Sequence, residues 1–418
     1  MHDRRIPEWL RHAPAPSVRG FAILAGTEAV ARGILISVFP VAMYAALQDA
    51  KLVSQVYFGI GTLSLLIGLL VPYLVRFIRR WWIYVAGALM FAGGALAAAL
   101  GTPVGTVTGL ALTTFAVVTM FVCFNAYVLD HVAKLDLGRF ETSRLFYSAM
   151  GWTIGPALGA FLHAWWPPAP FLIAAAAALT LLAIFLVMRL GNGKLIVKSR
   201  RPPANPFAYF GRFAAQPRLV TGWIFAVVRS CGWWVYVVYL PIFAVQNGLG
   251  SQIGGIALSI SNAALFLAPL MLRFMMRRSV RTAVRTGFLM SGLLFLAAFA
   301  VQAQPVLVVA LLMAGAFFLI LLDVSAGLPF LLAVKPSERT EMSAIYSSFR
   351  DVSGIVTPGV AWMVLLVAPL SGVFAAGGLG LLATWVLAGR LHPRLGQARI
   401  SFQPPVTAEP QTAPEPLA

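Results

Sequence analysis

Charged side chains stand inside long apolar segments of this sequence, where they could bind an ion or exchange a proton. Glu28 and Arg32 are the charged residues of the run 21–44. Four positions apart, they share one helix face, with Glu on the N-terminal side, the favourable order for an ion pair. A charge facing lipid costs about 2.5–3.5 kcal/mol, so both are expected to face a partner or a water-filled cavity.

A second arginine, Arg229, stands in a matching apolar segment of the second half. The Ala-Val-x-Arg of residues 29–32 returns at 226–229, an offset of 229 − 32 = 197. PYLVRF at 72–77 and PLMLRF at 269–274 repeat at the same offset, and R-x-E-x-S at 139–143 and 339–343 repeats at 200. These repeats predict a duplicated unit in which Arg32 and Arg229 take equivalent places.

The composition places the elements that carry these charges in a membrane. The chain of 418 residues is 60% hydrophobic and 11% charged, whereas a soluble domain has about 25% charged residues. The apolar stretches are long enough to cross a hydrocarbon core of about 30 Å. We predict an all-α polytopic membrane protein of about 12 spans, near 19–46, 54–77, 82–101, 104–128, 143–164, 168–189, 219–246, 251–275, 283–303, 305–332, 342–367 and 370–390.

The polar connections divide these spans into two six-helix bundles. The predicted parts are an N-terminal arm (1–18), a first bundle (19–190), a linker (191–218), a second bundle (219–391) and a disordered tail (392–418). Of the 31 Lys and Arg, 28 fall in connections or tails assigned to one side. This positive-inside bias predicts cytoplasmic termini and explains the net charge of +18 without a nucleic-acid partner. We expect a monomer in a bacterial cytoplasmic (inner) membrane.

Polar residues are unevenly distributed among the spans. The third, sixth, ninth and twelfth spans carry almost none and are expected to face lipid, whereas others carry Asn125, Arg229, Asn262 and Asp323. A rise of 1.5 Å per residue puts Arg32, Arg229 and Asp323 about 14–20 Å from the cytoplasmic surface, near the midplane. Trp233 and Tyr236 share the helix face of Arg229, where they could line a site or simply pack.

The sequence resembles the major facilitator superfamily of secondary transporters over essentially its whole length. The six-plus-six repeat, the basic linker and the basic cluster after the second span carry this resemblance. So does GWTIGPALGA at 151–160, which is similar to the family's fifth-helix motif GxxxGPxxGG. The motif is more frequent in antiporters and favours export. Physically, its small residues allow close helix approach and its proline bends the helix, so a packing seam is the alternative; the residues are Gly151, Gly155, Pro156 and Gly159.

Two further regions are candidate gates. After the second span, Arg76, Arg79 and Arg80 keep the basic positions of the family's loop motif, but its glycines and its Asp are missing. These arginines would be gate residues or topology anchors. Arg350 and Asp351, in the inner part of the eleventh predicted span, would be an inner-gate pair or a solvated helix start.

The resemblance implies alternating access around a midplane site. The first hypothesis is proton-coupled export of a small organic solute, with Glu28 and Asp323 taking the proton. The second is uptake or exchange of an organic anion clasped by Arg32 and Arg229, similar to the organophosphate and phosphate antiporters. Alternatively, each arginine is neutralised internally, Arg32 by Glu28 and Arg229 by Asp323.

Other residues and classes complete the prediction. We assign Asn125, Asn262, Trp233 and Tyr236 to the substrate site. A transporter-derived assembly or sensor protein that moves nothing is a third hypothesis. The sequence shows no phosphate loop, metal-ligand cluster or nucleophile–base arrangement, so we predict neither an enzyme nor a bound cofactor or metal.

Overall fold

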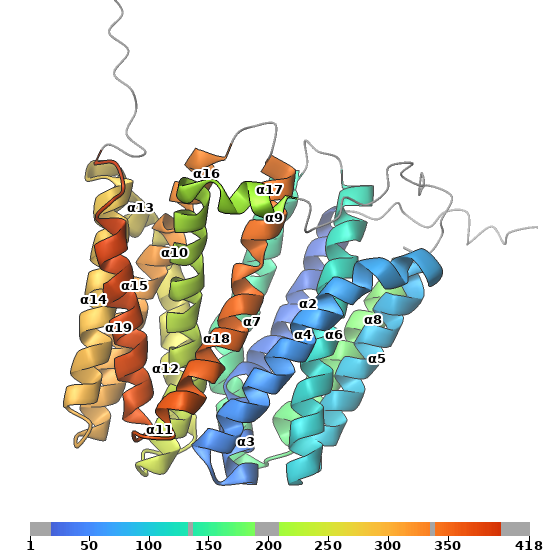
Figure 1. Cartoon of the computed structure of the whole chain (residues 1–418). Coiled ribbons are helices and arrows are strands. Elements are labelled where there is room, and N and C mark those ends of the chain that lie inside the picture. The colour runs from blue at the N-terminus through green and yellow to red at the C-terminus, as the bar shows by residue number, and fades with distance from the viewer. Residues whose placement is uncertain (1–17, 133–136, 189–208, 335–338, 394–418) are drawn as a thin grey trace, which may run out of the picture.

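The structure, a computed structural model, describes residues 18–132, 137–188, 209–334 and 339–393. Within these ranges it is helical and contains no strand. Eleven helical stretches there are long and apolar enough to cross a membrane. They run side by side, with α3 (Val38–Leu47) and α11 (Leu240–Gln246) at one end of the bundle (Figure 1). We call that end the opposite side, and the end where α2 (Val18–Ile36) begins the terminal side.

The helices form two halves of similar order. The remaining helices of the first half are α4 (Ala50–Phe77), α5 (Arg80–Ala99), α6 (Pro103–His131), α7 (Leu137–Trp165) and α8 (Ala169–Val187). The second half begins with α9 (Phe210–Ala214), α10 (Pro217–Trp234), the π-helix η1 (Val235–Tyr239), α12 (Gln252–Ala263), the 3₁₀-helix η2 (Ala264–Leu267) and α13 (Ala268–Arg277). It ends with α14 (Val280–Ala300), α15 (Pro305–Ser325), α16 (Leu328–Ala333), α17 (Arg339–Ser347), α18 (Phe349–Val364) and α19 (Ser371–Ala388).

Two predicted segments take a form that the sequence pattern did not show. The predicted span 342–367 is covered by α17 and α18, which are separated at Ser348, so that α18 alone has only 16 residues. The predicted linker ends in the short helix α9, whose Phe213 is buried against a small cluster with Leu219 and Phe330. Residues 191–208 of that linker, 1–17 of the N-terminal arm and 394–418 of the tail lie outside the described residues.

Prolines explain where the first helix of each half changes its geometry. Pro40 has no N–H to donate to the carbonyl of Ile36, and α2 ends at Ile36. Pro241 has none for Val237, which lies in the π-helix η1. The two prolines are 241 − 40 = 201 positions apart, close to the repeat offset in the sequence. The break in each first helix is therefore encoded in each half.

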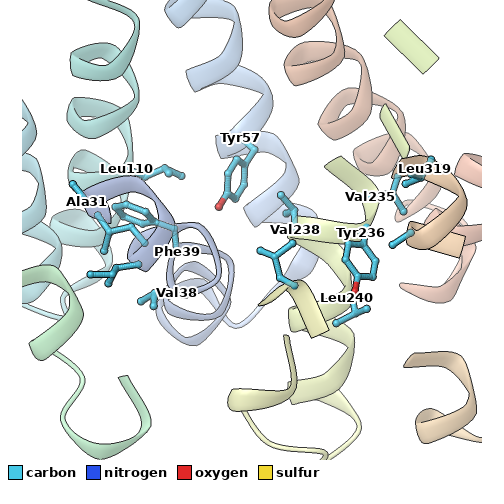
Figure 2. Packing of buried hydrophobic residues seen from close by; sticks show 14 of the residues in the cluster. Ala31, Val38, Phe39, Tyr57, Leu110, Val235, Tyr236, Val238, Leu240 and Leu319 are labelled. Carbon is cyan, nitrogen blue, oxygen red and sulfur yellow. The ribbon is translucent and has the colours of Figure 1, made fainter. Parts of the chain in front are cut away.

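One buried apolar cluster extends through both halves. It includes Phe39 and Tyr57 from the first half and Val235, Tyr236 and Val238 from the second. Figure 2 shows this part of the cluster, with the Tyr57 ring between residues of the two halves. The halves therefore share a core in this conformation.

Hydrogen bonds close the halves against each other towards the opposite side. Gln246 Nε2 donates to Tyr44 Oη at 3.1 Å, and Ser54 Oγ lies 2.9 Å from Tyr239 Oη. Further in, the backbone N of Ala157 donates to Ser259 Oγ at 2.9 Å. All these bonds lie in the half of the helices that is nearer the opposite side.

Candidate central site

The first-half arginine forms the predicted ion pair within its own helix. Arg32 Nη1 lies 3.2 Å from Glu28 Oε1, one turn earlier on α2. Its guanidinium also lies over the ring of Trp152 on α7, 5.2 Å from the ring centroid. The Arg32 side chain keeps 37% of its surface accessible, so a ligand can still reach it.

The second-half arginine pairs across two helices. Arg229 Nε on α10 lies 3.2 Å from Asp323 Oδ1 on α15, although its N–H is not aligned for a hydrogen bond. Trp233 Nε1, one turn further along α10, donates to the other carboxylate oxygen at 3.0 Å. The Arg229 guanidinium lies 5.2 Å from the ring centroid of Phe349 on α18. Asp323 is thus held by one ion pair and one hydrogen bond, both from α10.

Two further arginines stand near this pair of arginines. Arg350 on α18 is within electrostatic reach of Arg32, Arg229 and Arg144, and all three repel it. Its guanidinium also lies 5.8 Å from the ring centroid of Phe121, which belongs to α6 of the first half. The structure therefore places Arg350 near the central arginines, whereas the sequence pattern indicated either an inner-gate pair or a solvated helix start. Asp351 is beside it on α18 and attracts it.

The span 5 motif is a packing seam with contacts on two sides. A Cβ added to Gly155 would lie 2.7 Å from the backbone of Gly33 on α2, and one added to Gly159 would lie 2.1 Å from the Ile34 carbonyl oxygen. A Cβ on Gly151 would likewise meet the α2 backbone, at Ala29. This close approach fixes α2 on α7, so the motif positions Arg32 over Trp152.

Pro156 connects this seam to the second half. Because proline has no N–H, the carbonyl of Trp152 loses its helical partner. Asn262 Nδ2 on α12 donates to that carbonyl at 2.7 Å. The carbonyl of Pro156 itself accepts from Ser37 Oγ at 2.7 Å. Asn262, predicted to bind substrate, is thus engaged in a bond between the halves.

The remaining predicted site residues are dispersed. Tyr236 is 1% exposed, and its hydroxyl donates to the Ala257 carbonyl at 3.0 Å and lies 2.7 Å from Ser261 Oγ. It is therefore a packed residue here and not part of an accessible wall. Asn125 is half-buried on α6. The side chain of Arg76 lies outside those that the structure describes.

The sequence pattern did not reveal the aromatic residues whose rings contact the guanidinium groups of the central arginines. Trp152 and Phe349 lie beneath the guanidinium groups of Arg32 and Arg229. The available signal in the sequence was that both aromatic residues stand within predicted spans, the fifth and the eleventh. Their position along a span could not select them as arginine contacts, because it does not show which helices are neighbours.

Two helical halves with ion pairs inside their membrane-spanning helices are typical of a class, that of the secondary transporters. The profile of the Major Facilitator Superfamily matches residues 21–358, and the chain belongs to this family. It is an integral membrane protein, and its relationships are to transporters rather than to enzymes. No relative among curated proteins matches the sequence.

Solved structures share the fold. The nucleoside transporter NupG is 15% identical, with a TM-score of 0.67 over 90% of this chain and 100% of that one. A POT family transporter in complex with 5-aminolevulinic acid is 12% identical, with a TM-score of 0.68 over 88% and 95%. A POT family transporter in complex with a thioalcohol-conjugated peptide is 12% identical, with a TM-score of 0.70 over 88% of this chain and 95% of that one.

Proposed function

We propose that the chain carries a small organic anion together with a proton, by alternating access around the central arginines. One observation supports the anion above all: the Arg350 guanidinium on α18 is within electrostatic reach of Arg32 on α2, Arg144 on α7 and Arg229 on α10. Like charges repel strongly where water is scarce, and a bound anion relieves that repulsion. A planar guanidinium also suits carboxylate or phosphate groups, to which it can donate two parallel hydrogen bonds.

The acids supply a physical route to proton coupling. Glu28 and Asp323 each lie 3.2 Å from the arginine that an anion would use. When a proton neutralises one of these carboxylates, its arginine is released for the substrate. Proton and anion therefore favour each other's binding, and this coupling is reciprocal. The two would move in the same direction.

This coupling favours uptake over export. Proton-driven export requires that the proton and the substrate exclude each other, whereas here the proton makes room for the anion. Export, predicted from the span 5 motif, is thus the second candidate. The motif's own residues support a part in alternation, because they join α2, α7 and α12. With cytoplasmic termini, closure at the opposite side corresponds to an inward-facing state.

The Tm of the purified protein, measured with and without candidate ligands, tests whether the central site binds an anion. The ligands are an organic phosphate, a dicarboxylate, 5-aminolevulinic acid and a nucleoside as the neutral solute. We expect an anion to raise the Tm, and Arg32→Ala and Arg229→Ala to abolish that shift. Arg390→Ala, which removes an exposed arginine after α19, is the matched control. A shift from the nucleoside that survives both central variants would overturn the anion assignment.

Flux into proteoliposomes tests the coupling and its direction. We expect the anion to accumulate when the proton gradient points into the vesicles, and Glu28→Gln or Asp323→Asn to remove the dependence on that gradient. Accumulation driven by the reverse gradient would favour export. Absence of flux for every anion that stabilises the folded protein would favour a non-transporting sensor.

A further inference from the structure

A basic pocket outside the central site lies at the terminal side of the second half. It has a volume of about 350 Å³ and lies between the first turns of α14 and the last turns of α19. Its walls include Arg281, Thr282, Arg285, Thr286 and Trp385. None of these residues takes part in the proposed transport mechanism.

Neutral groups hold both arginines in place. Arg281 Nη2 donates to the carbonyl of Gly389, just past the end of α19, at 2.7 Å. The Arg285 guanidinium lies 5.1 Å from the ring centroid of Trp385. The Nε atoms of both arginines are buried and have no hydrogen-bond partner among the described residues. The two positive charges are thus fixed side by side, one helical turn apart, without being neutralised by their contacts.

The sequence around the pocket supplies no acid. There is no Asp or Glu in residues 271–322 or in residues 352–393, which contain α14 and α19. The charged residues that flank these two segments in the sequence are basic as well, namely Arg277, Arg278 and Arg390, and none of them lines the pocket. Two guanidinium groups in a pocket that two threonines also line are donors suited to the oxygens of a phosphate. The pocket therefore selects an anion, and phosphate fits its donors.

Its position points to a lipid as the source of that phosphate. Figure 1 shows α14 and α19 at the outer edge of the bundle, and Leu293 and Val386 on them are 47% and 67% exposed. Arg285 is five residues into α14, about 8 Å from its start. If α14 begins at the membrane surface, this is the level at which headgroups meet acyl chains. Leu289, one turn deeper on α14, adds an apolar side chain to the pocket lining. We propose that this pocket binds the phosphate group of a phospholipid in the leaflet at the terminal side.

The first half lacks such a pocket lining at the equivalent place. The helices α5 and α14 match at an offset of 200, since Gly87 and Gly287 both pack against the next span, at Met120 and Leu322 respectively. At that offset Arg281 and Arg285 correspond to Trp81 and Val85. The lipid site is therefore a property of the second half and not of the repeat.

Native mass spectrometry of the delipidated full chain tests the site. The ligands are phosphatidylglycerol, diacylglycerol with the same acyl chains, and inorganic phosphate. We expect phosphatidylglycerol to bind at least about tenfold more tightly than diacylglycerol, a difference of about 1.4 kcal/mol. The double variant Arg281→Gln with Arg285→Gln should remove that preference, and Arg390→Gln should keep it.

Separate outcomes would overturn the anion site and the lipid. Equal binding of phosphatidylglycerol and diacylglycerol to the wild-type protein would overturn the site, even if the double variant did not fold. Arg285→Lys keeps the positive charge but lacks the planar guanidinium with its parallel donors. If this variant retains the preference for phosphatidylglycerol, the site needs only a positive charge there, and the proposed geometry is overturned. Inorganic phosphate that displaces phosphatidylglycerol at equal concentration would assign the pocket to a soluble anion and overturn the lipid.

Discussion

In the first half, Arg32 meets an acid on its own helix, whereas in the second half Arg229 reaches Asp323 on another helix. The residues next to these two arginines also make different kinds of contact with the neighbouring helix. Gly33, next to Arg32, faces the backbone of Gly151, while Ser230, next to Arg229, accepts a hydrogen bond from Ser353 Oγ at 2.7 Å. The first half thus holds its arginine through backbone packing. The second half holds its arginine through side chains that a proton or a ligand can rearrange.

Substitution of the residue that follows each central arginine, Gly33 or Ser230, should have the largest effect on the stability of the fold. In Gly33→Ser the new Cβ would lie 2.3 Å from the Gly151 carbonyl oxygen, so α2 and α7 must separate. We expect a loss of about 3 kcal/mol or more in the free energy of unfolding, the upper range for overpacking. Ser230→Gly should cost only about 1 kcal/mol, for one lost hydrogen bond. Thermal unfolding in detergent measures both, and equal losses would contradict the comparison.

Neutralisation of Asp323 and of Glu28 should have the next largest effect, and the loss of stability should be greater for the acid of the second half. Asp323→Asn removes a charge that joins α10 to α15 and that faces a mostly buried Arg229, 13% exposed. We expect a loss of about 1–3 kcal/mol, between the ranges for exposed and buried pairs. Glu28→Gln should cost about 0.5 kcal/mol, as for other pairs within one helix. The Tm values of the two variants at neutral pH provide the test; a larger loss in Glu28→Gln would reverse the assignment.

The bond between Asn262 and Trp152 should set how firmly the opposite side closes. Asn262→Leu leaves the Trp152 carbonyl without its donor, at a cost of about 1–3 kcal/mol to the closed state. In the equivalent place of the second half, the Gly354 carbonyl instead faces Gly61, whose added Cβ would lie 2.7 Å from it. Spin-label distances across the opposite side should therefore broaden towards open states in Asn262→Leu. An unchanged distance distribution would exclude this role.

The smallest effect concerns Trp233, which has no equivalent in the first half. The matching position, 233 − 197 = 36, is Ile36. Trp233→Phe keeps an aromatic ring but removes the Nε1–H that donates to Asp323 at 3.0 Å. We expect a change of about 1 kcal/mol in the proton dependence of anion binding, with little change in the Tm. Anion binding measured across a pH series reports it, and the same curve for wild type and variant would show that Asp323 needs only Arg229.

Much of the fold and part of the site could be predicted from the sequence. The spans follow from apolar length. The expectation that Arg32, Arg229 and Asp323 lie near one depth follows from the rise of a helix and stays a prediction. The pair of Glu28 and Arg32 could be predicted because both lie on one helix. The hydrogen-bond partners of Asn262 and Tyr236 could not be predicted, since the partners of a polar side chain depend on which helix faces it.

The sequence by itself determined the membrane class and the duplicated halves, because composition and period can be read along the chain. Only the tertiary structure decided which groups meet. Arg350 joins the central arginines, and Asn262 bonds the carbonyl of a residue 110 positions away. The physical reason is lateral packing: small residues such as Gly33 and Gly155 set which helices touch, and neither periodicity nor hydropathy encodes that choice.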